Sequence, residues 1–199
     1  MNLVSADTLG PGARDDLRAI YEQSFDERLR SPFDDLLRDS VLVLADPRPH
    51  GMAVLRELGP TGWVFLRYFV VAAERRGDGV GARLWKLLTQ AMRDAGHTRI
   101  VFDVEDPART DDPAEAGIRR RRIGFYTRLG AQLLPVKGYT PPHGEEEHPL
   151  LLMAADLAVE TTRIHGGDLR DVVLAVYRHR YGLDPENPVV RKTLRQNTF

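Results

Sequence analysis

The chain has 199 residues, enough for one domain with a core and a small appendage. Its composition, 42% hydrophobic and 29% charged, is typical of a globular protein, and a formal net charge of -1 gives no positive field to gather nucleic acid. The absence of cysteine excludes disulfides and an acyl-cysteine intermediate. With neither a membrane-length apolar run nor a secretory leader in the sequence, we expect a cytoplasmic protein with no membrane or nucleic-acid partner.

The first part of the chain predicts a strand, two helices and an antiparallel meander. Residues 2–8 suit a short strand, and residues 13–25 carry apolar side chains at helical spacing. Ser31 is expected to cap a second short helix, because Pro32 follows it at the first helical position. Three β-like runs separated by turn sequences then predict the meander, at residues 40–46, 51–58 and 62–71.

The second part predicts further helices and strands and an appendage. A helix is expected from Gly79 to a stop at Gly96, and another from about residue 115 to a stop at Gly130. The expected strands are residues 98–104, 131–140 and 149–157. We therefore predict one domain at 1–158 and a helical extension at 159–199. The apolar face of 169–177 must be covered, either by the protein's own core or by a second subunit of a homodimer.

A glycine-rich stretch, ERRGDGVGARL, lies between a predicted strand and a predicted helix. The unpaired amides at a helix start bind phosphate oxygens, and glycines let the backbone approach closely. A dinucleotide is one phosphate ligand that fits this pattern. Gly77-x-Gly79-x-x-Ala82 satisfies a dinucleotide fingerprint, with Asp103 about 20 residues beyond it. The antiparallel meander before the glycines counts against that dinucleotide interpretation.

Two motifs together resemble the GNAT superfamily of N-acetyltransferases. The coenzyme A signature of that family is matched by Arg76, Gly77, Gly79 and Gly81. Residues 124–130 resemble a second motif, in which Tyr126 stands three residues before Leu129-Gly130. The resemblance covers residues 2–157. It implies an α/β (α+β) fold: a mixed, mostly antiparallel central sheet, flanked by helices and splayed between its two middle strands.

The resemblance implies acetyl-CoA as the co-substrate. Backbone amides would hold its pyrophosphate, from Arg76, Gly77, Asp78, Gly79, Val80, Gly81 and Ala82. Its pantetheine would lie along Phe69, Val70 and Val71, with an amide near Val71 as the oxyanion donor. The expected reaction transfers acetyl to a primary amine by direct attack in a ternary complex. An NAD(P)-dependent oxidoreductase and a non-catalytic acyl-CoA-binding module are the alternatives.

The resemblance implies a proton donor but does not identify a single catalytic base. Tyr126 matches the family's proton donor for the leaving thiolate. The strand at 62–71 has no carboxylate where many relatives place a glutamate, so Glu105 is the first choice of base, and Asp103, Asp106 and water are alternatives.

The acceptor is the least determined part of the reaction. Arg119 stands where the family usually has asparagine, at the start of a run of four arginines that reaches Arg122. Both a small-molecule amine and a protein or peptide amine remain open as acceptors. In this fold variable segments build the acceptor pocket: here residues 13–38, the long loop before 115, and the hairpin at 140–148. We expect no metal, because His143 and His148 lack ligand partners at useful spacing.

Overall fold

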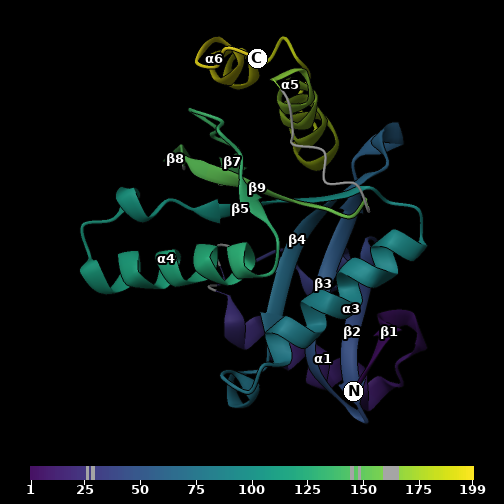
Figure 1. Cartoon of the computed structure of the whole chain (residues 1–199). Helices are drawn as coiled ribbons and strands as arrows, with labels where there is room; N and C mark the ends of the chain where they lie inside the picture. Colours follow the sequence, from purple (N-terminus) through teal and green to yellow (C-terminus); the bar gives the residue numbers. More distant parts are fainter. Residues whose placement is uncertain (26, 28–29, 144–145, 148, 159–165) are drawn as a thin grey trace. The chain divides into compact units, whose positions relative to one another are not determined.

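The computed structural model describes residues 1–199 except 26, 28–29, 144–145, 148 and 159–165. Its main sheet has seven strands in the order β1-β2-β3-β4-β5-β9-β6 (Figure 1). The strands are β1 (Asn2–Ser5), β2 (Ser40–Asp46), β3 (Arg48–Glu57), β4 (Trp63–Val71), β5 (Arg99–Glu105), β6 (Gln132–Leu133) and β9 (Leu150–Asp156). Two short strands, β7 (Pro142–His143) and β8 (Glu146–Glu147), pair separately.

The helices are α1 (Pro11–Ser24), α2 (Phe33–Leu36), α3 (Val80–Asp94), α4 (Pro113–Arg128), α5 (Gly166–Ala175) and α6 (Pro188–Arg195). The described pairs of strands are antiparallel except for β4 with β5, which run parallel over Trp63–Phe65 and Arg99–Val101. The predicted mixed, mostly antiparallel sheet flanked by helices is confirmed. The splay expected between β4 and β5 stays a prediction.

The chain forms two compact units. The first contains Met1–Arg56 and Leu66–Gly96, and the second contains Glu57–Phe65 and His97–Phe199. The boundary between 1–158 and 159–199 that the sequence suggests stays a prediction of domain organisation.

In the first unit, helices cover both faces of the sheet. Neighbouring residues of a strand point to opposite faces, so Val43 lies in a cluster with α1 and α2, while Leu44 lies in a cluster with α3. The α1 side includes Leu17, Tyr21, Phe33, Leu36, Met52, Val54 and Val70. This packing holds the last part of β4 and the start of α3 in a fixed relation.

In the second unit, α4 and the C-terminal helices contact β5 through opposite faces. The Phe102 ring lies against Tyr126 of α4, with the ring centroids 4.5 Å apart. Val101, the preceding residue, belongs to the buried cluster that includes Val172 and Tyr177. The apolar face at 169–177 is therefore covered by this unit's own core, and the homodimer stays a prediction.

Two local predictions are wrong. The run at 131–140 contributes only the two-residue strand β6, because Pro135 has no amide to donate and Gly138 adopts a left-handed φ of 64°. Ser31 does not cap α2, whose N-cap is Pro32 without a side-chain hydrogen bond. The hydroxyl of Ser31 is instead engaged by residues of β4.

Candidate active site

The glycine-rich turn leads directly into α3. Gly77 and Gly79 have left-handed φ values of 93° and 76°, and Gly79 is the N-cap of the helix. A Cβ atom built at either residue would meet nothing within 4 Å. The glycines are thus required by the backbone conformation and leave its surface open to a ligand.

The first turn of α3 presents backbone donors beside these glycines. The Arg83 amide donates the first intrahelical bond, to the Gly79 carbonyl at 3.0 Å. The amides of Val80, Gly81 and Ala82 precede that bond, so helix geometry gives them no intrahelical acceptor. Together with the positive end of the helix dipole, they form an arrangement suited to a phosphate group.

The Arg76 side chain ties this turn to its surroundings. Its Nε donates to the Val71 carbonyl at 3.1 Å, and Nη2 donates to Ser24 Oγ at 3.0 Å. The guanidinium therefore holds the end of β4 near α1. The structure gives Arg76 a bracing role in the turn, beside the backbone role that its motif predicts.

The predicted pantetheine strand has apolar side chains that are partly or fully packed. The Phe69 ring meets Trp85 of α3 edge-on, with centroids 6.0 Å apart. Val70 is 5% exposed and faces the α1 cluster, whereas Val71 packs with the α3 cluster. These residues supply a wall and no ionisable group.

Tyr126 lies at the end of α4, where the helix stops by a left-handed glycine. Gly130 has a φ of 92°, and the amides of Leu129 and Ala131 both donate to the Tyr126 carbonyl at 3.0 Å. The Tyr126 side chain is 7% exposed and packs against Phe102 and Phe125. Burial raises the pKa of Tyr126, and the opposing charge of Arg122 is the weaker influence. The phenol therefore stays protonated and able to donate.

The three carboxylates proposed as bases all have structural partners. Glu105 accepts from Arg122, and Arg119 Nη2 lies 3.6 Å from its other oxygen. Asp106 accepts from the Ala108 amide at 2.9 Å and so caps a short 3-10 turn. Each interaction occupies lone pairs that a base would need.

Asp103 is held by two tyrosines. Its Oδ2 accepts from Tyr139 at 3.1 Å and from Tyr181 at 2.7 Å. Burial raises the pKa of both phenols, so both remain donors. Tyr181 lies 78 residues from Asp103 along the chain, so no local pattern indicates it as a partner.

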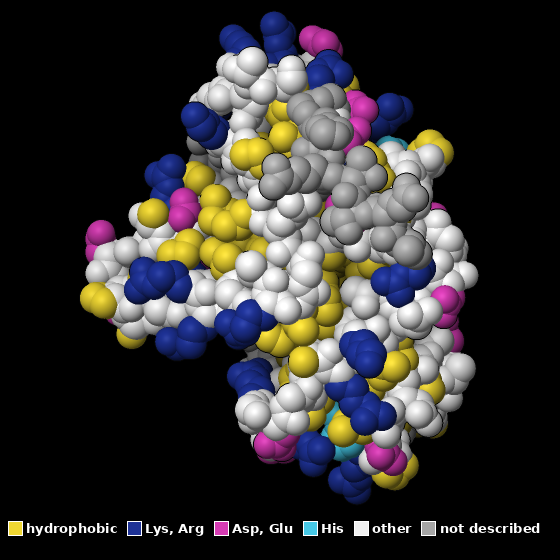
Figure 2. Space-filling view, viewed as in Figure 1, with side chains coloured by type: hydrophobic (Ala, Val, Ile, Leu, Met, Phe, Trp, Pro, Cys, Tyr) yellow, Lys and Arg dark blue, Asp and Glu magenta, His cyan; other side chains and the backbone are white. Residues whose placement is uncertain are grey.

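The arginine run on α4 is divided between solvent and acids. Arg119 donates to Glu115 at 3.0 Å and to the Asp106 carbonyl at 3.1 Å, while Arg120 and Arg121 are exposed. Figure 2 shows the resulting dark-blue surface over α4. Asp112 caps α4 by accepting from the Ala114 amide.

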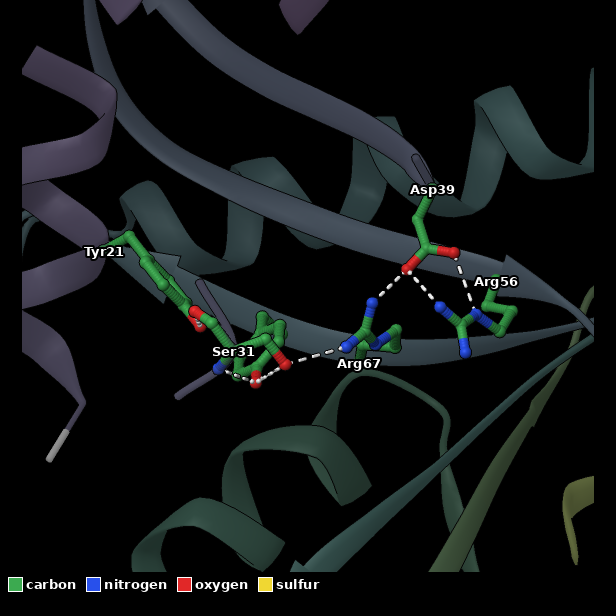
Figure 3. Close-up of polar contacts among 6 residues, drawn as sticks. Tyr21, Ser31, Asp39, Arg56 and Arg67 are labelled. Atoms are coloured by element: carbon green, nitrogen blue, oxygen red, sulfur yellow. Dashed lines mark hydrogen bonds and ion pairs between the residues drawn. The ribbon is translucent and has the colours of Figure 1, made fainter. Parts of the chain in front are cut away.

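Sequence reasoning missed a buried polar cluster in the first unit (Figure 3). Arg67 of β4 donates to Asp39 and, at 3.1 Å, to Ser31 Oγ. Arg56 of β3 donates to the other Asp39 oxygen at 2.8 Å. The available signal was a single arginine inside the apolar run of β4. The same cluster reaches Tyr68, whose hydroxyl accepts from the Ser31 amide at 3.1 Å.

Two features are absent from the described residues. No helix among them is both long and apolar enough to cross a bilayer. They also contain no group of three His, Asp or Glu side chains placed to hold a metal ion. His148 lies outside the described residues.

The sequence matches the acetyltransferase (GNAT) family over residues 11–131, more than half of the chain. The open mixed sheet, with a glycine turn opening α3, thus has a family assignment: the chain belongs to the GNAT acetyltransferases. No curated protein matches the sequence.

Solved structures share the fold at low identity. A protein assigned to the GNAT acetyltransferases from Bacteroides thetaiotaomicron superposes with a TM-score of 0.66 and 18% identity, over 92% of this chain and 100% of that one. An aminoglycoside 6'-N-acetyltransferase complexed with coenzyme A superposes with a TM-score of 0.60 and 17% identity, over 81% of this chain and 100% of that one. The ribosomal-protein-S18-alanine N-acetyltransferase from Escherichia coli superposes with a TM-score of 0.54 and 14% identity, over 82% of this chain and 98% of that one.

Proposed function

We propose that the chain transfers acetyl from acetyl-CoA to a primary amine by direct attack in a ternary complex. Family membership and the coenzyme A bound in one structure of the same fold support the co-substrate. The related structures include one enzyme named for an aminoglycoside and one named for a protein alanine. Small-molecule and protein amines therefore both remain candidate acceptors.

The observation that carries the proposal is the left-handed pair Gly77 and Gly79 at the start of α3, with open space where side chains would be. Backbone amides from Arg76 to Ala82 would hold the pyrophosphate. The pantetheine would lie along Phe69, Val70 and Val71, and an amide near Val71 would stabilise the oxyanion.

Proton transfer completes the proposed reaction. The buried phenol of Tyr126 would protonate the leaving thiolate, because burial keeps it neutral. Glu105 is the base that the sequence favours, and its use would require release from Arg119 or Arg122. A non-catalytic acyl-CoA-binding module remains the alternative of another class.

The dinucleotide alternative has less support. Dinucleotide folds use a parallel sheet, whereas most strand pairs here are antiparallel. Asp103, the residue required to bind a ribose, already accepts from Tyr139 and Tyr181.

Calorimetric titration with acetyl-CoA tests the proposal, with NADH and NADPH titrated in parallel. We expect acetyl-CoA alone to bind, and Gly79→Asp to abolish that binding by placing a carboxylate where the phosphate would lie. The matched control is Gly96→Asp, at the other end of α3, because Gly96 also has a left-handed φ, of 86°, and open space around it. Binding of a nicotinamide cofactor, or equal loss in both variants, would contradict the proposal.

Tyr126→Phe separates an enzyme from a binding module. Loss of the hydroxyl should lower kcat by about 100-fold with acetyl-CoA affinity unchanged. The measurement is acetyl transfer to a panel of primary amines, with calorimetry on the same sample. Coenzyme binding without turnover in the wild-type chain would favour the non-catalytic module.

A further inference from the structure

Tyr68 and Arg67 are the polar residues of β4 immediately before Phe69. Arginine stays protonated in proteins, so among these two only the Tyr68 phenol can accept a proton. Tyr68 is partly exposed, while Asp39 and Arg67 beside it are buried, with 6% and 5% of their side chains exposed. The strand that lacks a carboxylate thus carries one accessible group able to exchange a proton.

The Tyr68 hydroxyl is placed by Ser31, in the segment between α1 and α2. The Ser31 amide donates to Tyr68 Oη at 3.1 Å, and the Ser31 hydroxyl lies 3.3 Å from the same oxygen. Arg67 Nη2 donates to that hydroxyl at 3.1 Å, which leaves the hydroxyl proton able to turn to Tyr68. The Ser31 amide donates to the phenol oxygen, and the Ser31 hydroxyl can donate to it once the phenol is ionised, so both groups favour the ionised form.

The surroundings distinguish Tyr68 from its neighbour Tyr21. The Tyr68 ring packs edge-on against Tyr21 and Phe25, each with centroids 5.1 Å away, and the Arg67 guanidinium lies 5.6 Å from its centre. Tyr21 Oη donates to the Ser31 carbonyl at 3.0 Å. The Ser31 amide therefore donates to the Tyr68 oxygen, whereas the Tyr21 hydroxyl is itself a donor to Ser31.

The pKa directions of the two phenols differ accordingly. Burial opposes ionisation of Tyr68 most strongly, but hydrogen bonds with Ser31 and Tyr21 and the charge of Arg67 outweigh it, so the pKa of Tyr68 is lowered. Burial raises the pKa of Tyr21. Behind Arg67, Asp39 and Arg56 are the other charged members of the cluster. Acid–base sites commonly contain two neighbouring groups whose pKa values their surroundings shift in opposite directions.

We propose that Tyr68 is the catalytic base that takes the first proton from the attacking ammonium group, with Ser31 and Arg67 as its positioning residues. The inference rests on the proposed acetyl transfer, in which the thioester lies beside Phe69–Val71. The Tyr68 phenolate takes one proton and leaves a neutral amine. The nitrogen lone pair then forms a bond to the thioester carbon, and the carbon–sulfur bond breaks. The nitrogen then gives its second proton to solvent, and Tyr126 gives one proton to the thiolate and takes one back from solvent. Tyr68 returns its proton to solvent, so one proton is released per amide formed.

A tyrosinate titration followed by ultraviolet difference absorbance tests the inference without an acceptor. The wild-type chain is compared with Tyr68→Phe and with the matched control Tyr21→Phe. We expect Tyr68→Phe to lack the part of the absorbance change that occurs below the ordinary tyrosine pKa of about 10. Tyr21→Phe should lack a part that occurs above that value. If the early part of the curve is unchanged in Tyr68→Phe, the inference is overturned.

Kinetics supply the second test, with kanamycin, spermidine and an alanine-terminated peptide as the amine probes. Tyr68→Phe should lower kcat by about 100-fold with acetyl-CoA binding unchanged. Tyr21→Phe removes one hydrogen bond that lowers the pKa of Tyr68, so it should keep turnover with the rise in rate moved to higher pH. Glu105→Gln removes the carboxylate that the sequence favours as the base, and it is assayed beside Tyr68→Phe. If Glu105→Gln loses turnover while Tyr68→Phe keeps it, Glu105 is the base and the inference fails. Where no probe reacts, the titration decides.

Ser31→Ala tests the positioning role. A base must be deprotonated, so kcat/KM rises as pH passes through the pKa of Tyr68. Removing the Ser31 hydroxyl raises that pKa, so the rise should move to higher pH, with activity recovered there. An unmoved profile would exclude this role for Ser31. A wild-type chain that binds no acetyl-CoA overturns the proposed function instead, whereas binding with a fully active Tyr68→Phe overturns only the inference about the base.

Discussion

Asp39 is a buried charge that two arginines share. Its carboxylate accepts from Arg56 and Arg67, and its side chain is 6% exposed. Asp39→Asn keeps the shape of the side chain but leaves Arg67 without its counter-charge in a buried site. Breaking a buried pair by removing one partner costs about 3–5 kcal/mol, so we expect a loss of that size in the free energy of unfolding at about pH 7. Urea denaturation measures it.

The pH dependence of this effect follows from the pKa of Asp39. Burial opposes its ionisation most strongly, but the hydrogen bonds from Arg56 and Arg67 prevail and lower the pKa. The stabilisation is therefore present above the unfolded pKa of about 3.9 and disappears as pH falls through the lower folded value. The difference between wild type and Asp39→Asn should shrink in acid. Asp35→Asn, which alters the exposed pair with Arg38, is the control and should change stability by less than about 0.5 kcal/mol.

Single residues also show where sequence reasoning about the site reached its limit. The glycines of the turn follow from local sequence alone, since a left-handed φ before a helix requires them, and Gly77 and Gly79 have that conformation. Ser31 and Tyr68 are 37 residues apart, and their contact depends on how α1 and α2 pack against the strands. A capping rule assigns Ser31 to the helix that follows it, because the rule contains no term for that long-range partner.

At the scale of elements, the end of α4 depends on one glycine. Gly130 has a φ of 92°, a region in which a Cβ atom adds strain. Gly130→Ala should cost about 1–2 kcal/mol. Gly12, inside α1, has nothing within 4 Å of an added Cβ, so Gly12→Ala should stabilise by about 0.5–1 kcal/mol. Thermal unfolding measures the change in stability of both variants. If both changes have the same sign, the explanation from backbone φ is contradicted.

Element boundaries were predictable where the signal was local. The helix after the glycine turn ends at Asp94, just before the left-handed Gly96, as its apolar spacing indicates. The run at 131–140 has the composition of a strand, yet Leu134–Tyr139 instead meets the C-terminal helices in the buried cluster. Asn197 donates to the Lys137 carbonyl and accepts from the Lys137 amide, both at 2.8 Å. These pairings lie 60 residues apart, so periodicity did not indicate them.

At the scale of the whole molecule, the C-terminal helices are part of a core. The segment made of α5, the π-helical turn that follows it (Val176–Arg180) and α6 contributes to the cluster that contains Phe65, Val101 and Leu152. Its members there are Leu169, Val172, Val173, Ala175, Val176, Tyr177 and Val190. Tyr177 and Thr193 share a hydrogen bond of 2.8 Å, and Thr193 also donates to the Gly138 carbonyl at 2.8 Å. The family match ends at residue 131, so these contacts belong to a part of the chain that it does not cover.

A chain ending at residue 158 should therefore fail to fold stably. Each buried aliphatic side chain contributes about 1.5–3 kcal/mol, so losing those of α5 and α6 removes an amount comparable with the whole stability of a domain, about 5–15 kcal/mol. A chain ending at Gln196 is the control, because it chiefly loses the Asn197 bonds to Lys137 and the packing of the partly buried Phe199, and it should be destabilised by about 1–3 kcal/mol. Thermal unfolding of both compares them with the full chain. A cooperative transition at the full-length midpoint for the shorter chain would show that the domain at 1–158 is independent of the extension, since the remaining residues would then bury a sufficient core by themselves.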